Sequence, residues 1–87
     1  MTTQSRIVMY GTSWCGDCRR ARRVFDQHQT AYDYIDIEKD ASAADYVQQV
    51  NGGNQSVPTI IFPDGSVLVE PSSAVLTSKL QQLGLIA

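Results

Sequence analysis

Residues 12–18 read TSWCGDC, and the rest of the chain is organised around them. A short apolar segment rich in β-branched residues, from about Arg6 to Tyr10, precedes this stretch. Apolar side chains then recur at spacings of three and four through residues 18–28. These patterns predict a strand followed by a helix from about Gly16 to Gln27 or His28. The two cysteines therefore lie at a strand-to-helix turn, at the N-terminus of the helix.

The position of Cys15 favours nucleophilic chemistry. A helix N-terminus offers unpaired backbone N–H groups and the positive end of the macrodipole, and both stabilise an anion such as the reactive thiolate. One backbone N–H contributes roughly 1.5–3 kcal/mol to a charged acceptor, whereas an exposed charge on the same helix contributes about 0.3–0.5 kcal/mol. We therefore expect main-chain donors to outweigh Asp17 and Cys15 to be the nucleophile. Cys18, one turn further in, should be more buried and less acidic.

Two structural alternatives use the same cysteine pair. Structural zinc needs about four protein ligands, and the chain has two cysteines and one histidine, His28, at the far end of the predicted helix. A permanent disulfide that closes so short a loop would stabilise little. We therefore favour a redox-active pair with no metal site. His28 is expected to complement the helix dipole rather than take part in catalysis.

Length and composition indicate one domain that covers residues 1–87, with 43% hydrophobic residues to fill a single core. Residues 1–6 contain no apolar segment of the kind found in export signals, and no run approaches transmembrane length. We expect a cytoplasmic monomer with no membrane partner. In such a reducing compartment a cysteine pair is more often catalytic than structural.

The net charge of −2 is unevenly distributed. Residues 1–23 contain five arginines and one aspartate, and residues 24–87 contain two lysines and eight acidic residues. An acidic domain without interleaved aromatic residues is not expected to bind nucleic acid. The arginines at 19, 20, 22 and 23 are interpreted as a solvated helix face, or else as a local field that draws anionic thiols toward Cys15.

The remaining chain predicts one further helix between strands and a closing helix. Residues 32–37 read as a strand parallel to the first, because a strand, a helix and a strand within some thirty residues form a βαβ unit. Asp40 is a plausible N-cap for a helix that ends at residues 51–53. A strand follows within residues 56–62, and because proline cannot donate to a sheet ladder, Pro58 must lie at its start or edge.

The C-terminal part predicts a hairpin and a helix. Asp64-Gly65 signals an antiparallel turn into residues 67–69. Ser72 or Ser73 then caps a helix whose inward face should carry Val75, Leu76, Leu80 and Leu83. The predicted order is β-α-β-α-β-β-α, an α/β fold with a four-stranded mixed sheet and helices on both faces.

This order, with Cys-x-x-Cys at the first helix start and Val57-Pro58 opening the third strand, resembles the thioredoxin fold. The chain length and Trp14-Cys15-Gly16-x-Cys18 resemble glutaredoxins. The closest resemblance, over nearly the whole chain, is to the mycoredoxins, actinobacterial glutaredoxin-like proteins that use mycothiol. Its motifs are Ser13–Cys18, Val50–Asn54 with Ser56–Thr59, Asp64–Ser66 and Pro71-Ser72.

The resemblance implies a thiol–disulfide oxidoreductase that reduces mixed disulfides between proteins and a low-molecular-weight thiol, mycothiol, through Cys15 and with Cys18. It implies no tightly bound cofactor. Its implied partners are S-thiolated proteins, the small thiol and a flavin disulfide reductase. Pro58 matches the family's cis-proline, and the backbone of Val57 is expected to pair with substrate by strand addition at short range.

Two departures from the family concern the small thiol. Asp17 stands where many glutaredoxins carry an aromatic residue, and Glu70–Ser73 occupies the region of the glutathione-binding Gly-Gly-x-x-Asp segment. At Asp17 an apolar contact to substrate is expected to be missing or replaced by a polar one, and the second departure favours a thiol other than glutathione. Trp14 is expected to be exposed beside Cys15. The residues predicted to bind the thiol or substrate are Trp14, Gly16, Asp17, Arg19, Val57, Pro58 and Ser72.

Two other functions fit the same residues. The chain could be a redoxin that donates electrons to ribonucleotide reductase and is recharged by thioredoxin reductase. It could also be an iron–sulfur carrier in which two chains each supply Cys15 to a [2Fe–2S] cluster and two external thiols complete the ligands.

Overall fold

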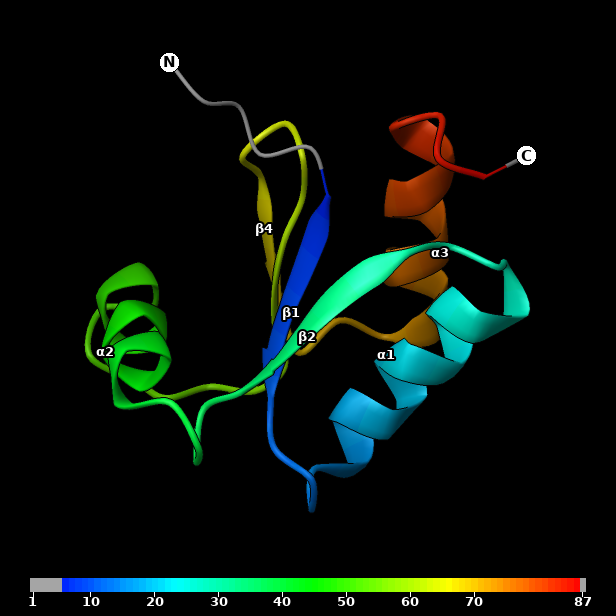
Figure 1. Cartoon of the computed structure of the whole chain (residues 1–87). Coiled ribbons are helices and arrows are strands. Elements are labelled where there is room, and N and C mark those ends of the chain that lie inside the picture. Colours follow the sequence, from blue (N-terminus) through cyan, green and yellow to red (C-terminus); the bar gives the residue numbers. More distant parts are fainter. Residues whose placement is uncertain (1–5, 87) are drawn as a thin grey trace.

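A computed structural model describes residues 6–86 of the chain (Figure 1). Residues 1–5, on which the expectation of no export signal largely rests, lie outside the described residues, as does Ala87. The first three elements are β1 (Ile7–Gly11), α1 (Gly16–Gln27) and β2 (Tyr32–Asp36). β1 and β2 pair in parallel, with Ile7 opposite Tyr32, so the predicted βαβ unit is confirmed.

The second half of the chain completes the sheet in the opposite sense. β3 (Thr59–Ile61) pairs antiparallel with β1, and β4 (Val67–Val69) pairs antiparallel with β3. The strand order is therefore β2-β1-β3-β4, a four-stranded mixed sheet. β3 covers only the middle of the predicted strand region 56–62. The residues before it form the loop that approaches the cysteines.

Helices cover both faces of the sheet, as Figure 1 shows. α1 and α3 (Ser73–Gln82) pack against each other on one face, and α2 (Ala41–Val50) lies on the other. The alternation of side chains along β1 serves both layers, because Met9 joins the core under α1 and α3 whereas Tyr10 packs against the cluster under α2. The predicted layer arrangement is confirmed.

The larger core cluster lies between the sheet and the two helices α1 and α3 (Figure 1). Its side chains come from β1, α1, β3, α3 and the residue after β3, and each fully buried large one stabilises the fold by roughly 1.5–3 kcal/mol. Those with no exposed surface are Met9, Phe25, Ile60, Phe62 and Leu80. This packing fixes α1 against the sheet, and with it the turn at residues 12–15.

Side-chain caps start the other two helices where the sequence predicts them. The Asp40 carboxylate accepts a hydrogen bond from the Ala43 N–H at 3.1 Å, and the Ser72 hydroxyl accepts one from the Val75 N–H at 3.1 Å. Gly84 follows α3 with a φ of +71°, a backbone conformation that favours glycine. The start of α3 therefore agrees with the sequence prediction.

The expectation that Val75 faces inward is wrong. Leu76 and Leu80 are buried and Leu83 packs against the core, but the Val75 side chain is 50% exposed. Successive helix residues are rotated by about 100°, so a stripe through 76, 80 and 83 leaves the residue before it turned toward solvent.

Replacing Ser72 by alanine should destabilise the protein by about 1 kcal/mol, because the Val75 N–H at the start of α3 loses its acceptor. Urea unfolding would measure the loss. Ser78→Ala, on an exposed position of the same helix, is the matched control and should leave the free energy of unfolding nearly unchanged. Equal losses in the two variants would contradict the capping role.

Candidate active site

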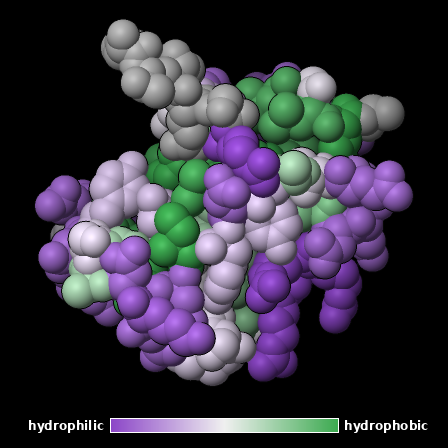
Figure 2. Space-filling view, in the orientation of Figure 1, coloured by the Kyte–Doolittle hydropathy of each residue, from purple (hydrophilic) through white to green (hydrophobic). Residues whose placement is uncertain are grey.

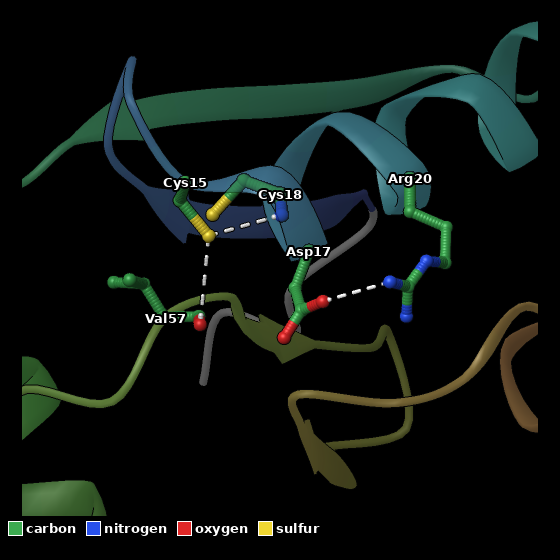
Figure 3. A network of polar contacts seen from close by, with 5 residues as sticks. All are labelled: Cys15, Asp17, Cys18, Arg20 and Val57. Atoms are coloured by element: carbon green, nitrogen blue, oxygen red, sulfur yellow. Dashed lines mark hydrogen bonds and ion pairs between the residues drawn. The ribbon is translucent and has the colours of Figure 1, made fainter.

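Cys15 is the N-cap of α1. Its backbone is extended, with φ −78° and ψ 116°, and its sulfur accepts a hydrogen bond from the Cys18 N–H at 3.0 Å (Figure 3). The Cys15 N–H in turn donates to the Thr12 carbonyl at 3.4 Å, which closes the turn between β1 and α1. The predicted contact between the outer sulfur and a main-chain amide at the helix start is confirmed. A donor in this place stabilises negative charge on the sulfur.

The loop before β3 forms the other side of the site. The Cys15 thiol donates to the Val57 carbonyl at 3.7 Å, as Figure 3 shows. The Val57-Pro58 peptide bond is cis, as the family resemblance implies, and Pro58 is buried. The Pro58 carbonyl accepts the N–H of Glu70 at 2.9 Å, so the segment after β4 lies against the same loop.

A shallow cleft of about 450 Å³ opens beside Cys15. The Cys15 side chain is 6% exposed at its base, and the indole of Trp14, 65% exposed, stands at its rim, so the expected exposure of Trp14 is confirmed. The residues that line the cleft are Trp14, Cys15, Gly16, Asp17, Gln55, Ser56, Val57 and Glu70.

Cys18 lies deeper than Cys15, as predicted. It is 1% exposed, and burial is the main cause that raises the pKa of its thiol to about 12, with the neighbouring Cys15 side chain adding to the shift and the Thr12 backbone opposing it. Its sulfur packs against Gly11, where a Cβ would lie only 2.8 Å from it and 3.2 Å from the Tyr34 ring. Cys18 is thus a protonated, enclosed thiol at neutral pH.

The arginines of α1 are not among the residues that line the cleft. All four are exposed, and Figure 2 shows a hydrophilic surface over α1. Arg20 pairs with Asp17 at 3.0 Å (Figure 3), while Arg22 donates to the Tyr32 hydroxyl at 3.2 Å and lies 4.6 Å from the Tyr34 ring centre. This arrangement supports the interpretation of a solvated helix face.

The structure brings most of the predicted binding residues together, but not all. Trp14, Gly16, Asp17 and Val57 line the cleft with Cys15. Arg19 contributes its backbone N–H to the Cys15 carbonyl at 3.2 Å, but its side chain does not line the cleft, nor do Pro58 or Ser72. A role for these three side chains in contacting the thiol stays a prediction.

The sequence did not single out four residues that the structure places at the site. Gln55, Ser56 and Glu70 line the cleft, and Gly11 leaves space for the Cys18 sulfur. Glu70 lies in segment 70–73, which departs from the glutaredoxin pattern. That departure could have marked Glu70 as a candidate cleft residue. The other three had no signal in a single sequence, because loop placement and a close contact both depend on packing.

Within residues 6–86, no three His, Cys, Asp or Glu side chains gather as a metal-binding group. None of the helices described in that range is long and apolar enough to cross a bilayer.

The sequence matches the family model of glutaredoxin over residues 7–68. Among curated relatives, "Putative glutaredoxin Rv3198A" of Mycobacterium tuberculosis is 44% identical over 77 residues, which are 88% of this chain and 92% of that protein. Mycoredoxin 1 of Corynebacterium glutamicum is 35% identical over 79 residues, 91% of this chain and 98% of that protein.

Solved structures agree on the fold. The thioredoxin-like protein BC3987 has a TM-score of 0.69 at 28% identity and covers 90% of this chain and 99% of its own. A glutaredoxin of Archaeoglobus fulgidus has a TM-score of 0.70 at 23% identity, over 90% of this chain and 84% of its own. The fold is therefore thioredoxin-like, as the sequence led us to expect.

Replacing Gly11 by alanine should destabilise the protein by about 1–3 kcal/mol, because the added methyl group overlaps the Cys18 sulfur and the Tyr34 ring. Thermal or urea unfolding would measure the loss. Gly16→Ala is the matched control, since nothing lies within 4 Å of a Cβ there and alanine suits the first turn of α1. A Gly11→Ala protein as stable as Gly16→Ala would contradict the close contact.

Proposed function

This chain belongs to the glutaredoxin family of thiol–disulfide oxidoreductases, and we propose that its Cys15 reduces mixed disulfides formed between proteins and mycothiol. The observation that carries the proposal is the hydrogen bond from the Cys18 N–H to the Cys15 sulfur at 3.0 Å, at the start of α1. A main-chain donor in this place stabilises the negative charge that an attacking thiolate carries. The cleft beside it leaves room for a small thiol.

In the first step the Cys15 thiolate attacks the mycothiol sulfur of the mixed disulfide. A sulfur–sulfur bond to Cys15 forms, the bond to the target protein breaks, and the target leaves as a thiolate that takes up a proton from water. The Cys18 N–H, already directed at the sulfur, holds the charge before the attack. The enzyme is left as a Cys15–mycothiol mixed disulfide, and the target protein is reduced.

In the second step a free mycothiol thiolate attacks the mycothiol sulfur of the Cys15–mycothiol disulfide, and the bond to Cys15 breaks. Mycothiol disulfide leaves, and Cys15 returns as a thiolate. We propose this monothiol route over attack by Cys18, because Cys18 is 1% exposed and its raised pKa keeps it protonated. A flavin disulfide reductase would then reduce mycothiol disulfide, so the cycle belongs in a reducing compartment such as the cytoplasm.

Mycothiol is proposed as the small thiol on two grounds. A relative 35% identical over 91% of this chain is named Mycoredoxin 1. The glutathione-binding Gly-Gly-x-x-Asp segment of glutaredoxins is replaced here by Glu70–Ser73.

Single cysteine variants test both the nucleophile and the route. With a mycothiol mixed disulfide as substrate and mycothiol as reductant, Cys15→Ser should lose essentially all turnover. Cys18→Ser should retain at least about half of it, since the proposed route does not use Cys18. Turnover that survives Cys15→Ser would reject the nucleophile, and loss of turnover in Cys18→Ser would reject the monothiol route.

Three further measurements distinguish this proposal from the use of another thiol, from a redoxin and from an iron–sulfur carrier. Turnover with bacillithiol or glutathione but not with mycothiol would reject the thiol assignment. NADPH consumption with thioredoxin reductase and no small thiol would instead indicate a redoxin that donates electrons to ribonucleotide reductase. Visible absorbance and a dimer after anaerobic purification would indicate the [2Fe–2S] carrier.

The rate at which the Cys15–Cys18 disulfide forms, measured against pH, tests whether the Cys18 thiol is protonated. Burial, the main cause of its raised pKa, persists when Cys15 is in a mixed disulfide, so only a small fraction of Cys18 is thiolate at neutral pH. The rate at which Cys18 displaces mycothiol from Cys15 should therefore keep rising by about tenfold per pH unit up to about pH 10, whereas a thiol of ordinary pKa would level off near about pH 9. Mass spectrometry of the quenched Cys15–mycothiol adduct would follow it, with Cys18→Ser as the control that releases nothing. A pH-independent rate would contradict the raised pKa.

A further inference from the structure

We propose that two carboxylates, those of Asp17 and Glu70, make the cleft beside Cys15 select against thiols with a net negative charge. The thiol that the cleft accepts is then an uncharged, hydroxyl-rich one. This inference rests on the proposed function and names the chemistry by which the site distinguishes one small thiol from another.

The charge of the cleft is the first observation. Of the described residues that line it, the charged ones are Asp17, on the first turn of α1, and Glu70, directly after β4. They come from two segments far apart in the sequence, and Cys15 lines the same cleft. A small thiol bound through its sulfur to Cys15 therefore extends past one or both carboxylates. A carboxylate on that thiol would meet like charge, which is unfavourable.

No cation in the lining offsets this charge. The arginines of α1 are solvent-exposed and do not line the cleft. Arg20 does pair with Asp17 at 3.0 Å, so part of the Asp17 charge is already compensated (Figure 3). Within residues 6–86, no cation pairs with the Glu70 carboxylate. Glu70 should therefore contribute more to the selection than Asp17.

The backbone of Glu70 is a second, independent observation. Its φ is +48°, in the left-handed region that is sterically disfavoured for residues with a side chain. The Glu70 N–H donates to the Pro58 carbonyl at 2.9 Å, which holds this conformation against the loop beside Cys15. A residue other than glycine that is kept in a disfavoured backbone conformation beside a reactive site points to a function for its side chain.

The remaining polar groups suit a hydroxyl-rich ligand. Gln55 and Ser56 line the cleft together with the two carboxylates. Carboxylate oxygens accept hydrogen bonds, so sugar or polyol hydroxyls can donate to them, whereas a deprotonated carboxylate on the ligand has no hydrogen to offer. The same two side chains thus repel one class of thiol and bind the other.

Two thiols with the same peptide skeleton and sulfur but different charge test the selection, and the charge variants separate the effect of charge from that of the added ethyl groups. Glutathione has two carboxylates and one ammonium group, and its diethyl ester keeps the ammonium group and the same sulfur but has no carboxylate. Each is placed in a mixed disulfide with the same uncharged fluorescent peptide, and kcat/KM is measured at low salt. The proteins are wild type, Glu70→Gln, Asp17→Asn and the double variant. Glu38→Gln is the matched control, because Glu38 is exposed and outside the cleft lining.

Wild type should turn over the ester disulfide faster than the glutathione disulfide. Glu70→Gln should lower that ratio by about two- to fivefold, Asp17→Asn by less, and the double variant by the most. Added salt should lower the ratio in wild type, and Glu38→Gln should leave it unchanged.

Two results would overturn the selection while leaving the proposed function intact. One is equal turnover of the two disulfides by wild type, and the other is an unequal ratio that Glu70→Gln and the double variant leave unchanged. If neither disulfide is turned over, and a mycothiol mixed disulfide is not turned over either, the proposed function itself is wrong and the selection fails with it.

Discussion

The hydrogen bond between the Cys18 N–H and the Cys15 sulfur depends on where α1 begins, and most of the fold serves to fix that point. β1 ends at Gly11 and α1 starts at Gly16, so only a short turn separates the central strand from the helix. Phe25 and Phe62, both fully buried, hold the helix against the sheet. A small shift of α1 would move the amide away from the sulfur, because the donor belongs to the helix and the acceptor to the turn.

The two cysteines are chemically unlike although only one helical turn separates them. Cys15 lies at the floor of an open cleft with a main-chain donor on its sulfur, whereas Cys18 is enclosed against Gly11 with a pKa raised by burial. The same helical turn therefore places a hydrogen-bond donor on the Cys15 sulfur and keeps the Cys18 thiol protonated. The backbone N–H of Cys18 donates to the Cys15 sulfur, while the Cys18 side chain stays protonated near neutral pH.

Local signals in the sequence predicted most of the fold, since helix caps and periodicity act over a few residues. The bounds of α1, the caps Asp40 and Ser72, and the parallel pairing of β1 and β2 all agree with the sequence. The sequence predicted the cleft residues at the start of α1 and Val57, but not Gln55, Ser56 or Glu70. Glu70 comes to Cys15 through its contact with Pro58, a contact between segments that a single sequence does not specify. Val75 was misplaced because an apolar residue next to a helical stripe is indistinguishable from a member of it.

Trp14 is the single tryptophan of the chain, and its indole stands 65% exposed at the rim of the cleft that holds the nucleophile. An adduct attached to Cys15 would occupy the cleft that this ring lines, and so we expect it to change the surroundings of the ring. The tryptophan emission of the unlabelled protein therefore originates beside Cys15, because the chain has no second indole. The molecule carries a built-in optical reporter of its own redox cycle, readable without dye or tag.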